Sequence, residues 1–189
     1  AVAQAGVLNG KSVLIAGSGP IGLLTLVVAK MAGADKVVMT DLVPARLSAA
    51  QRLGADAALS ATAGSWQEEL ADVIGAAGVD TAFDAVGIPA TFDQALQSVK
   101  PGGTVVALGG WQTVPFNLAY LVARELTVRA SFNFTPDEFA LARQWIEDNI
   151  FDPAALVTAV YPMADGAAVF EDLSAQELQA IKVVLTVPE

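Results

Sequence analysis

The clearest chemical signal in the chain is residues 17–22, which read Gly-Ser-Gly-Pro-Ile-Gly. This G-x-G-x-x-G pattern is informative only where it follows a strand and opens a helix. In that setting Gly17 permits a tight turn, Gly19 lets the backbone approach a pyrophosphate, and Gly22 lets the helix pack closely on the strand. The first N–H groups of the helix then offer hydrogen bonds and partial positive charge to phosphate oxygens. The run predicts a dinucleotide-binding turn, against the alternative of a plain strand-to-helix connection.

An acid follows where an adenosine ribose would lie. Asp41 comes 24 residues after Gly17, at the end of an expected strand, and its carboxylate can accept hydrogen bonds from ribose hydroxyls. It would also repel a 2′-phosphate, so it favours NAD over NADP. Arg46 could stack on the adenine through its planar guanidinium or hold a 2′-phosphate, and Asp41 argues against the second role. The alternatives are an Asp that only caps the turn before Pro44 and an Arg that is only a solvated helix charge.

The scaffold for these residues follows from the hydrophobic pattern, in which short apolar runs alternate with helical periodicity as in βαβ units. We expect strands at residues 12–16, 36–40, 55–59, 79–85, 104–108 and 126–130. We expect helices at residues 21–32, 44–53, 66–74 and 90–99, with Pro20 at the first helical position and Pro-Gly-Gly at 101–103 as a turn. In the helix at 90–99, one apolar face would hold Phe92, Ala95, Leu96 and Val99. Six strands with the glycine turn after the first predict an α/β fold, a doubly wound parallel sheet of Rossmann type in the order 3-2-1-4-5-6.

The pattern changes after Phe134. Helices are expected at residues 136–148 and 164–173, an irregular extended segment at 152–162 and a strand-like tail at 182–187. We therefore expect residues 1–134 to form an NAD-binding domain and residues 135–189 to form a C-terminal appendage of helical and extended segments.

Composition excludes several classes of function. A formal net charge of −10 disfavours nucleic-acid binding through a broad basic surface and binding to an anionic membrane. The chain has no Cys and no His, so it contains no His base, Cys nucleophile or Cys/His metal site. The absence of disulfides fits a cytoplasmic protein. The uncharged runs at 12–29 and 101–123 are interrupted by Gly and Pro, so no membrane span is expected. The 54% hydrophobic content indicates strands buried on both faces or an apolar surface for a partner.

A series of blocks in order resembles the zinc-type branch of the medium-chain alcohol dehydrogenases. They begin with the glycine turn and Asp41, continue with Leu-Gly-Ala-Asp and Pro-Gly-Gly-Thr-Val-Val, and end with Tyr-Pro-Met and Ile-Lys-Val-Val-Leu. The final blocks are most similar to butanediol, threonine and sorbitol-type dehydrogenases. The blocks occupy residues 13–23, 33–38, 41–42, 46–47, 53–56, 79–80, 84–87, 101–106, 161–163, 168–173 and 181–185.

The resemblance implies that a GroES-like substrate domain, supplying zinc ligands from Cys, His and Glu, precedes this region in the family. We expect the chain to be the C-terminal cofactor-binding portion, with zinc only in the absent N-terminal half and residues 135–189 packing on that half. The full-length enzyme would pass a hydride between a secondary alcohol or diol and NAD, with a small alcohol or ketone as substrate. The chain alone would bind NAD without turnover.

The resemblance also implies further cofactor contacts at strand ends, with ordinary turn chemistry as the alternative. It predicts a short interface strand at residues 112–116 and a homodimer through residues 111–117, where a buried loop is the alternative. The expected cofactor-binding residues are Gly17, Gly19, Pro20, Ile21, Gly22, Asp41, Arg46, Val86, Gly87, Leu108, Gly109, Ser131, Phe132 and Asn133.

Three other functions are compatible with a glycine turn. A stand-alone NAD-sensing or scaffolding module would need this chain length to be native, and a methyltransferase can also carry a glycine-rich turn with an acid after the second strand. A zinc-free quinone reductase would prefer NADPH, and Asp41 argues against it.

Overall fold

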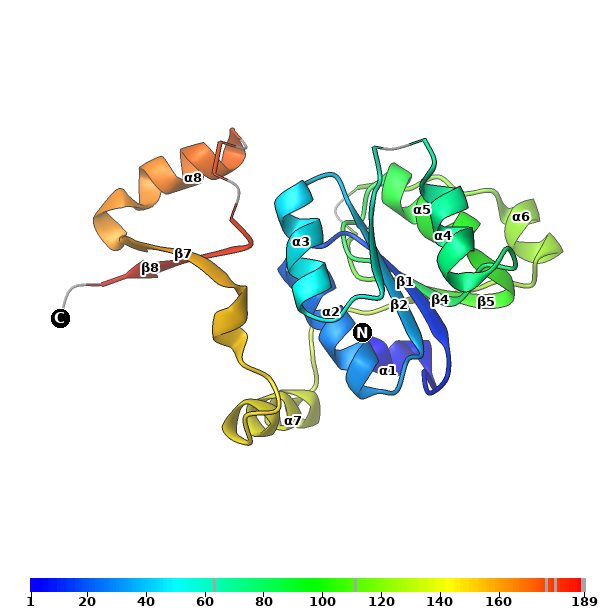
Figure 1. Cartoon of the computed structure of the whole chain (residues 1–189), viewed down its shortest axis with the longest axis horizontal. Helices are drawn as coiled ribbons and strands as arrows, with labels where there is room; N and C mark the ends of the chain where they lie inside the picture. Colours follow the sequence, from blue (N-terminus) through cyan, green and yellow to red (C-terminus); the bar gives the residue numbers. More distant parts are fainter. Residues whose placement is uncertain (63, 111, 176, 179, 188–189) are drawn as a thin grey trace. The chain divides into compact units, whose positions relative to one another are not determined.

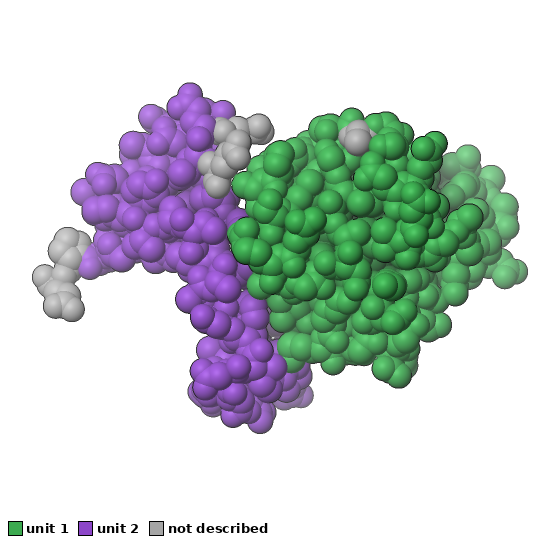
Figure 2. Space-filling model, in the orientation of Figure 1, with its two compact units in different colours: residues 1–132 green, residues 133–189 purple. Residues whose placement is uncertain are grey.

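The computed structural model describes residues 1–62, 64–110, 112–175, 177–178, 180–187 and divides the chain into two compact units, Ala1–Phe132 and Asn133–Glu189 (Figure 2). The division expected from the sequence lay at residue 134. The functions expected of the two parts stay predictions.

The first unit contains a six-stranded sheet in the order β3-β2-β1-β4-β5-β6, and every neighbouring pair is parallel. This order confirms the predicted doubly wound α/β fold. The central strands are almost fully buried because helices cover both faces of the sheet, which explains their near-continuous apolar sequence. The strands are β1 Ser12–Ala16, β2 Lys36–Asp41, β3 Ala57–Ser60, β4 Val79–Asp84, β5 Val99–Ala107 and β6 Thr127–Ala130.

Helices of the first unit lie on both sides of the strands, with α2 and α3 on one side and α4 and α5 on the other (Figure 1). A proline occupies the first helical position of α2, α3 and α5, where its missing N–H is not needed. Leu70, Phe92 and Leu96 pack with Leu14 and Val105 in the core beneath α4 and α5. The helices are α1 Val2–Ala5, α2 Pro20–Met31, α3 Pro44–Arg52, α4 Trp66–Ile74, α5 Pro89–Ser98 and α6 Leu118–Ala123.

The turn predicted at residues 101–103 is wrong as a boundary, because β5 already begins at Val99 and runs through it. Val79 of β4 pairs with Val99, but Thr81 pairs with Thr104, so β5 contains three extra residues in a bulge. Gly102, at φ 74°, lies in this bulge and donates its N–H to the carbonyl of Arg124 over 2.8 Å. Val99 is therefore buried as a strand residue and not as the last residue of a helix.

The short strand predicted at residues 112–116 is also not observed. Residues 112–117 have no regular secondary structure, and α6 begins at Leu118. Trp111 lies outside the described residues. An interface strand needs a partner strand for its hydrogen bonds, so a single chain gives this segment no ladder to join.

The second unit contains α7 and a two-stranded parallel sheet of β7 and β8. Helix α7 begins with a capping box, in which Thr135 accepts from the N–H of Glu138 and Glu138 accepts from the N–H of Thr135. The segment predicted as extended and irregular at 152–162 is a 3₁₀ turn followed by the extended strand β7. No helix in the described part of the chain is long and apolar enough to cross a membrane. The elements are α7 Pro136–Glu147, η1 Pro153–Leu156, β7 Val157–Pro162, η2 Met163–Asp165, α8 Gly166–Ser174 and β8 Lys182–Thr186.

Candidate functional site

The glycine turn connects β1 to α2, and its three glycines have three different structural reasons. Gly17 has a φ of 98°, and a Cβ there would lie 2.5 Å from Val86 Cγ2. A Cβ on Gly22 would overlap the carbonyl oxygen of Gly17, so this position admits no side chain without backbone movement. A Cβ on Gly19 would meet no atom within 4 Å. Gly17 and Gly22 are therefore required by the fold, whereas Gly19 leaves open space above the turn.

The N-terminus of α2 faces that open space without a side-chain cap. Gly19 is the N-cap residue in an extended conformation, no side chain accepts from the first turn, and Pro20 is the first helical residue. The helical hydrogen bonds begin with Leu23 N donating to Gly19 O over 2.9 Å, and Ile21 is 56% exposed. An uncapped start of a 12-residue helix has the N–H groups and the dipole that favour a phosphate. This geometry fits a dinucleotide pyrophosphate.

Asp41 lies directly beside the glycine turn and is only 8% exposed. Its Oδ2 accepts the backbone N–H of Ser18 over 2.7 Å, and its Oδ1 accepts the N–H of Val43 over 2.9 Å. Asp41 therefore also caps the turn after β2, which was the alternative interpretation of this residue. Since a carboxylate oxygen can accept more than one hydrogen bond, the carboxylate can still accept from ribose hydroxyls.

Arg46 lies in the first turn of α3, five residues after Asp41, and is half-buried. Its backbone N–H donates to Val43 O over 3.0 Å, and its guanidinium forms no hydrogen bond or ion pair with the described residues. The guanidinium is thus free to contact a ligand near Asp41.

The loops after β4 and β5 are held together by Asp84, which ends β4. Its Oδ1 accepts the N–H groups of Val86 and Gly87 over 3.0 and 2.9 Å, and its backbone carbonyl accepts those of Leu108 and Gly109 over 2.9 and 3.2 Å. Asp84 was not among the functional residues predicted from the sequence. A polar side chain closing an apolar strand just before a Val-Gly turn was the available signal.

Of the site residues predicted after β6, Ser131 and Phe132 belong to the first unit and Asn133 belongs to the second. Ser131 donates its N–H to Ala107 O over 3.0 Å, which brings it beside the end of β5, and Phe132 is 88% exposed. Asn133 begins the second unit with a φ of 60°. The structure therefore brings the loops after β1, β2, β4, β5 and β6 to the same carboxyl-end edge of the sheet, where open α/β sheets bind ligands. The role of Asn133 stays a prediction.

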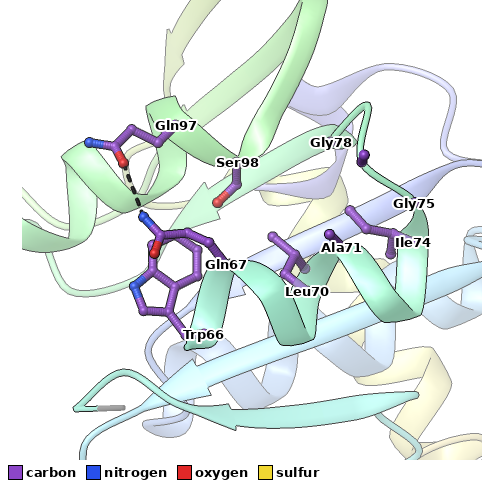
Figure 3. Close-up of a pocket in the computed structure, with 10 residues that line it drawn as sticks. Trp66, Gln67, Leu70, Ala71, Ile74, Gly75, Gly78, Gln97 and Ser98 are labelled. Carbon is purple, nitrogen blue, oxygen red and sulfur yellow. Dashed lines mark hydrogen bonds between the residues drawn. The ribbon is translucent and has the colours of Figure 1, made fainter. Parts of the chain in front are cut away.

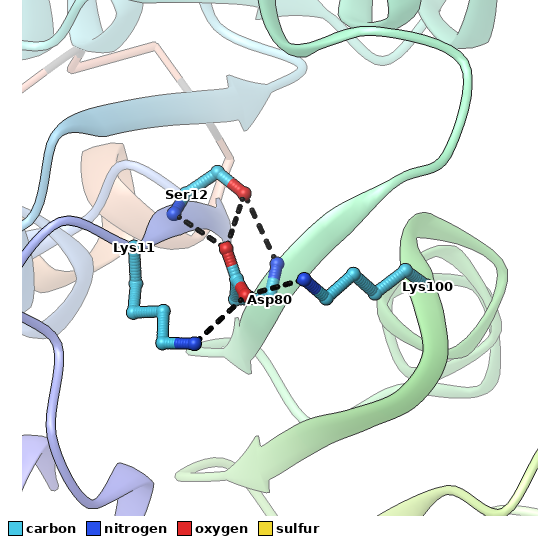
Figure 4. A network of polar contacts seen from close by, with 4 residues as sticks. All are labelled: Lys11, Ser12, Asp80 and Lys100. Carbon is cyan, nitrogen blue, oxygen red and sulfur yellow. Dashed lines mark hydrogen bonds and ion pairs between the residues drawn. The ribbon is translucent and has the colours of Figure 1, made fainter.

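A polar network at the opposite edge of the sheet belongs to the fold and not to this site (Figure 4). Asp80, at the start of β4, accepts the N–H and hydroxyl of Ser12 over 2.9 Å each and forms ion pairs with Lys11 and Lys100. Burial by itself raises the pKa of Asp80, but hydrogen bonds from Lys100, Ser12 and Lys11 together hold that pKa well below its usual range. The network therefore ties together the amino ends of β1, β4 and β5.

A small cavity of about 160 Å³ lies between α4 and the end of α5 (Figure 3). Trp66, Leu70 and Ile74 line it from α4, and Gln97 and Ser98 line it from α5. Gly78, which precedes β4, also contributes to the lining, so the cavity lies toward the amino end of that strand. It is therefore separate from the carboxyl-end site.

A zinc site cannot be assembled from the residues of this chain that the structure describes. The sequence has no Cys or His, and no three Asp or Glu side chains cluster within the described ranges.

Comparison with known proteins gives consistent similarities. Residues 20–148 match the family model described as zinc-binding dehydrogenase. L-idonate 5-dehydrogenase (NAD(P)(+)) of Escherichia coli K12 is 32% identical over 86% of this chain and 46% of that protein, and sorbitol dehydrogenase of Bacillus subtilis 168 is 28% identical over 98% of this chain and 53% of that protein. Alcohol dehydrogenase TADH from Thermus sp. ATN1 superposes with a TM-score of 0.90 at 30% identity, over 99% of this chain and 55% of that chain.

The chain spans about half the length of the curated relatives it matches. These similarities do not favour the methyltransferase or quinone reductase alternatives.

Proposed function

The chain belongs to the zinc-binding dehydrogenase family, and on that premise we propose that it binds the nicotinamide cofactor of an alcohol or polyol dehydrogenase. The observation that carries the proposal is the uncapped start of α2, open above Gly19, with the carboxylate of Asp41 hydrogen-bonded to the turn itself. These residues would hold the pyrophosphate and the adenosine ribose next to each other.

The proposed cofactor is NAD. Asp41 is buried and its position is fixed by two backbone N–H donors, so it cannot easily turn away from a ligand. A 2′-phosphate beside it would bring two negative groups into a poorly hydrated region, which is unfavourable. The E. coli relative is named for both NAD and NADP, so membership of the family does not by itself decide between the two cofactors. The preference proposed for this chain therefore rests on its own Asp41. Arg46 is the residue through which NADP could still be accommodated.

The bound cofactor would supply the hydride acceptor for oxidation of a secondary alcohol or a diol. The residues of this chain would bind and orient it: α2 faces the pyrophosphate, Asp41 the ribose, and the loops held by Asp84 the nicotinamide half. With no His and no Cys, the chain itself has neither of the side chains that most often serve as base or metal ligand. We therefore propose that the 189 residues bind NAD without oxidising alcohols.

A homodimer through the open edge of the sheet is a further part of the proposal. All four residues of β6 are exposed, and Phe116, Leu118 and Val122, which precede β6 in the chain, expose 55–69% of their surfaces. An uncovered edge with apolar neighbours favours pairing with a second copy. Sedimentation velocity across a concentration series would test it, with a monomer at all concentrations contradicting it.

Titration calorimetry of the 189-residue chain with NAD and with NADP tests the cofactor proposal. We expect saturable binding of NAD and at least about tenfold weaker binding of NADP, the difference that about 1.4 kcal/mol gives. Equal affinities would contradict the assignment of NAD, and no binding of either would contradict the proposed function.

A further inference from the structure

Asp84 is an almost completely buried acid, 1% exposed, with only half of its carboxylate satisfied. Its Oδ1 accepts from Val86 and Gly87, but its Oδ2 is buried without a hydrogen-bond partner among the described residues. The ion pairs of the described chain involve Asp80, Asp56 and Glu147, and none includes Asp84. A buried acid without a cation or a second set of donors is unfavourable for folding, so its presence calls for an explanation.

The position of Asp84 is central to the candidate site. Strand β4 lies between β1 and β5, and at its end Ala85 donates to Ala16 O over 2.9 Å while Leu108 donates to Asp84 O. The carboxylate therefore lies beneath the meeting point of the loops after β1, β4 and β5. If the chain binds a nicotinamide dinucleotide as proposed, the half that carries the nicotinamide crosses these loops.

NAD⁺ and NADH differ in that region by one unit of charge. The oxidised nicotinamide ring carries a positive charge and the reduced ring is neutral, whereas the pyrophosphate is the same in both forms. We propose that the uncompensated negative charge of Asp84 favours the oxidised cofactor, so that Asp84 determines the ratio of the two affinities. This inference rests on the proposed function. Asp84 would act through space and not by contact, because its carboxylate is covered by its own loops.

The ratio of the NAD⁺ and NADH affinities distinguishes an electrostatic role of Asp84 from a purely structural one. Asp84→Asn keeps an oxygen that can accept from Val86 and Gly87, puts an NH₂ group of similar size in place of the unpartnered Oδ2, and removes the charge. If the nicotinamide ring binds about 10–15 Å from the carboxylate, Coulomb's law at an effective dielectric constant of about 20–40 gives roughly a 3- to 15-fold change in relative affinity. We therefore expect D84N to shift the preference toward NADH by about 3- to 15-fold. A variant that merely loosened the loops would weaken both forms alike.

The experiment measures dissociation constants of NAD⁺ and NADH for the 189-residue chain by calorimetry, with NADH fluorescence as a second readout. Asp93→Asn is the matched control, since Asp93 lies on the exposed surface of α5 and D93N removes the same charge. The ratio of the NAD⁺ and NADH dissociation constants of D93N should equal that of the parent chain. If D84N folds poorly, Asp84→Ser removes the charge and retains one acceptor oxygen, and the same shift is expected.

An unchanged ratio in D84N, with both forms still bound, would overturn the inference and leave Asp84 as a loop cap. Failure of the parent chain to bind either form would instead contradict the proposed function, so the two failures are distinguishable. A shift in D93N as large as that in D84N would also overturn it, because net charge alone would then be responsible.

Discussion

The backbone N–H of Ser18 donates to Oδ2 of Asp41 over 2.7 Å, which joins the middle of the glycine turn to the end of β2. The two residues are 23 positions apart and both are buried. The acid proposed to bind the ribose therefore also holds the turn proposed to bind the pyrophosphate. Substitution of Asp41 should affect both subsites together.

Replacement of Asp41 should not convert the chain to NADP. Asp41→Ala removes the repulsion of a 2′-phosphate, but it leaves the N–H groups of Ser18 and Val43 without an acceptor. We expect NAD affinity to fall by about tenfold to a hundredfold, as for loss of hydrogen bonds to a charged group. We expect NADP to bind D41A more weakly than NAD binds the parent chain. Calorimetry with both cofactors measures this, and NADP binding as tight as the parent's NAD binding would contradict it.

Substitutions at two glycines of the same turn should change different properties: one should weaken NAD binding and the other should lower the stability of the fold. Gly19→Ala places a methyl group in open space, whereas Gly22→Ala forces one against the carbonyl of Gly17. We expect G19A to melt at the parent temperature and to bind NAD at least about tenfold more weakly, because the methyl group blocks the approach of phosphate to the backbone N–H donors. We expect G22A to lose about 3 kcal/mol of stability, or roughly 6–12 °C in melting temperature.

Thermal unfolding and calorimetry on both variants measure these effects, and each variant serves as the control for the other. Normal NAD binding by G19A would show that no pyrophosphate lies over the turn. Normal stability of G22A would mean that the turn moves freely to admit a side chain.

The sequence predicted the sheet order and the glycine turn because both depend on local patterns. An apolar run, a turn and a helical period recur within each βαβ unit, and the six strands and four helices predicted for these units begin and end within two residues of the expected positions, apart from the early start of β5. The placement of Asp41 followed from the same logic. Its hydrogen bond to Ser18 did not, because that contact depends on how β1 and β2 pair.

The features that were missed depend on contacts between distant residues. The bulge in β5 is defined by its register against Val79 and Thr81, which no pattern within residues 99–104 records. The short helices α1 and α6 have too few residues to show a periodicity. The position of Asp84 at the end of an apolar strand is visible in the sequence, but the burial of its Oδ2 without a partner among the described residues is not.

The isolated chain should bind NAD without oxidising alcohols. It contains no Cys or His, and its described acids do not gather in threes to hold a metal. We expect no formation of NADH, measured by absorbance, with a panel of secondary alcohols and diols, with or without added Zn²⁺. NAD binding by the same preparation is the necessary control. NADH produced in proportion to the amount of chain would contradict the prediction.

The network around Asp80 should make stability depend on acid pH. Because the folded-state pKa of Asp80 lies below its unfolded value, its contribution is present above about pH 4–5 and is lost as the pH falls below about 4. Asp80→Asn should lower the free energy of unfolding by about 1–2 kcal/mol at pH 7, since both lysine partners are partly exposed. The difference between the two chains should shrink between pH 5 and pH 3.

Urea unfolding of both chains across that range measures the difference. The pKa of Asp56 is lowered as well, but its titration is common to both chains and cancels. Asp35→Asn is the matched control, because Asp35 is an exposed acid just before β2 whose side chain forms no hydrogen bond or ion pair within the described part of the chain. A D80N deficit that stays constant from pH 7 to pH 3 would mean that Asp80 stabilises the fold through its shape and not through its charge.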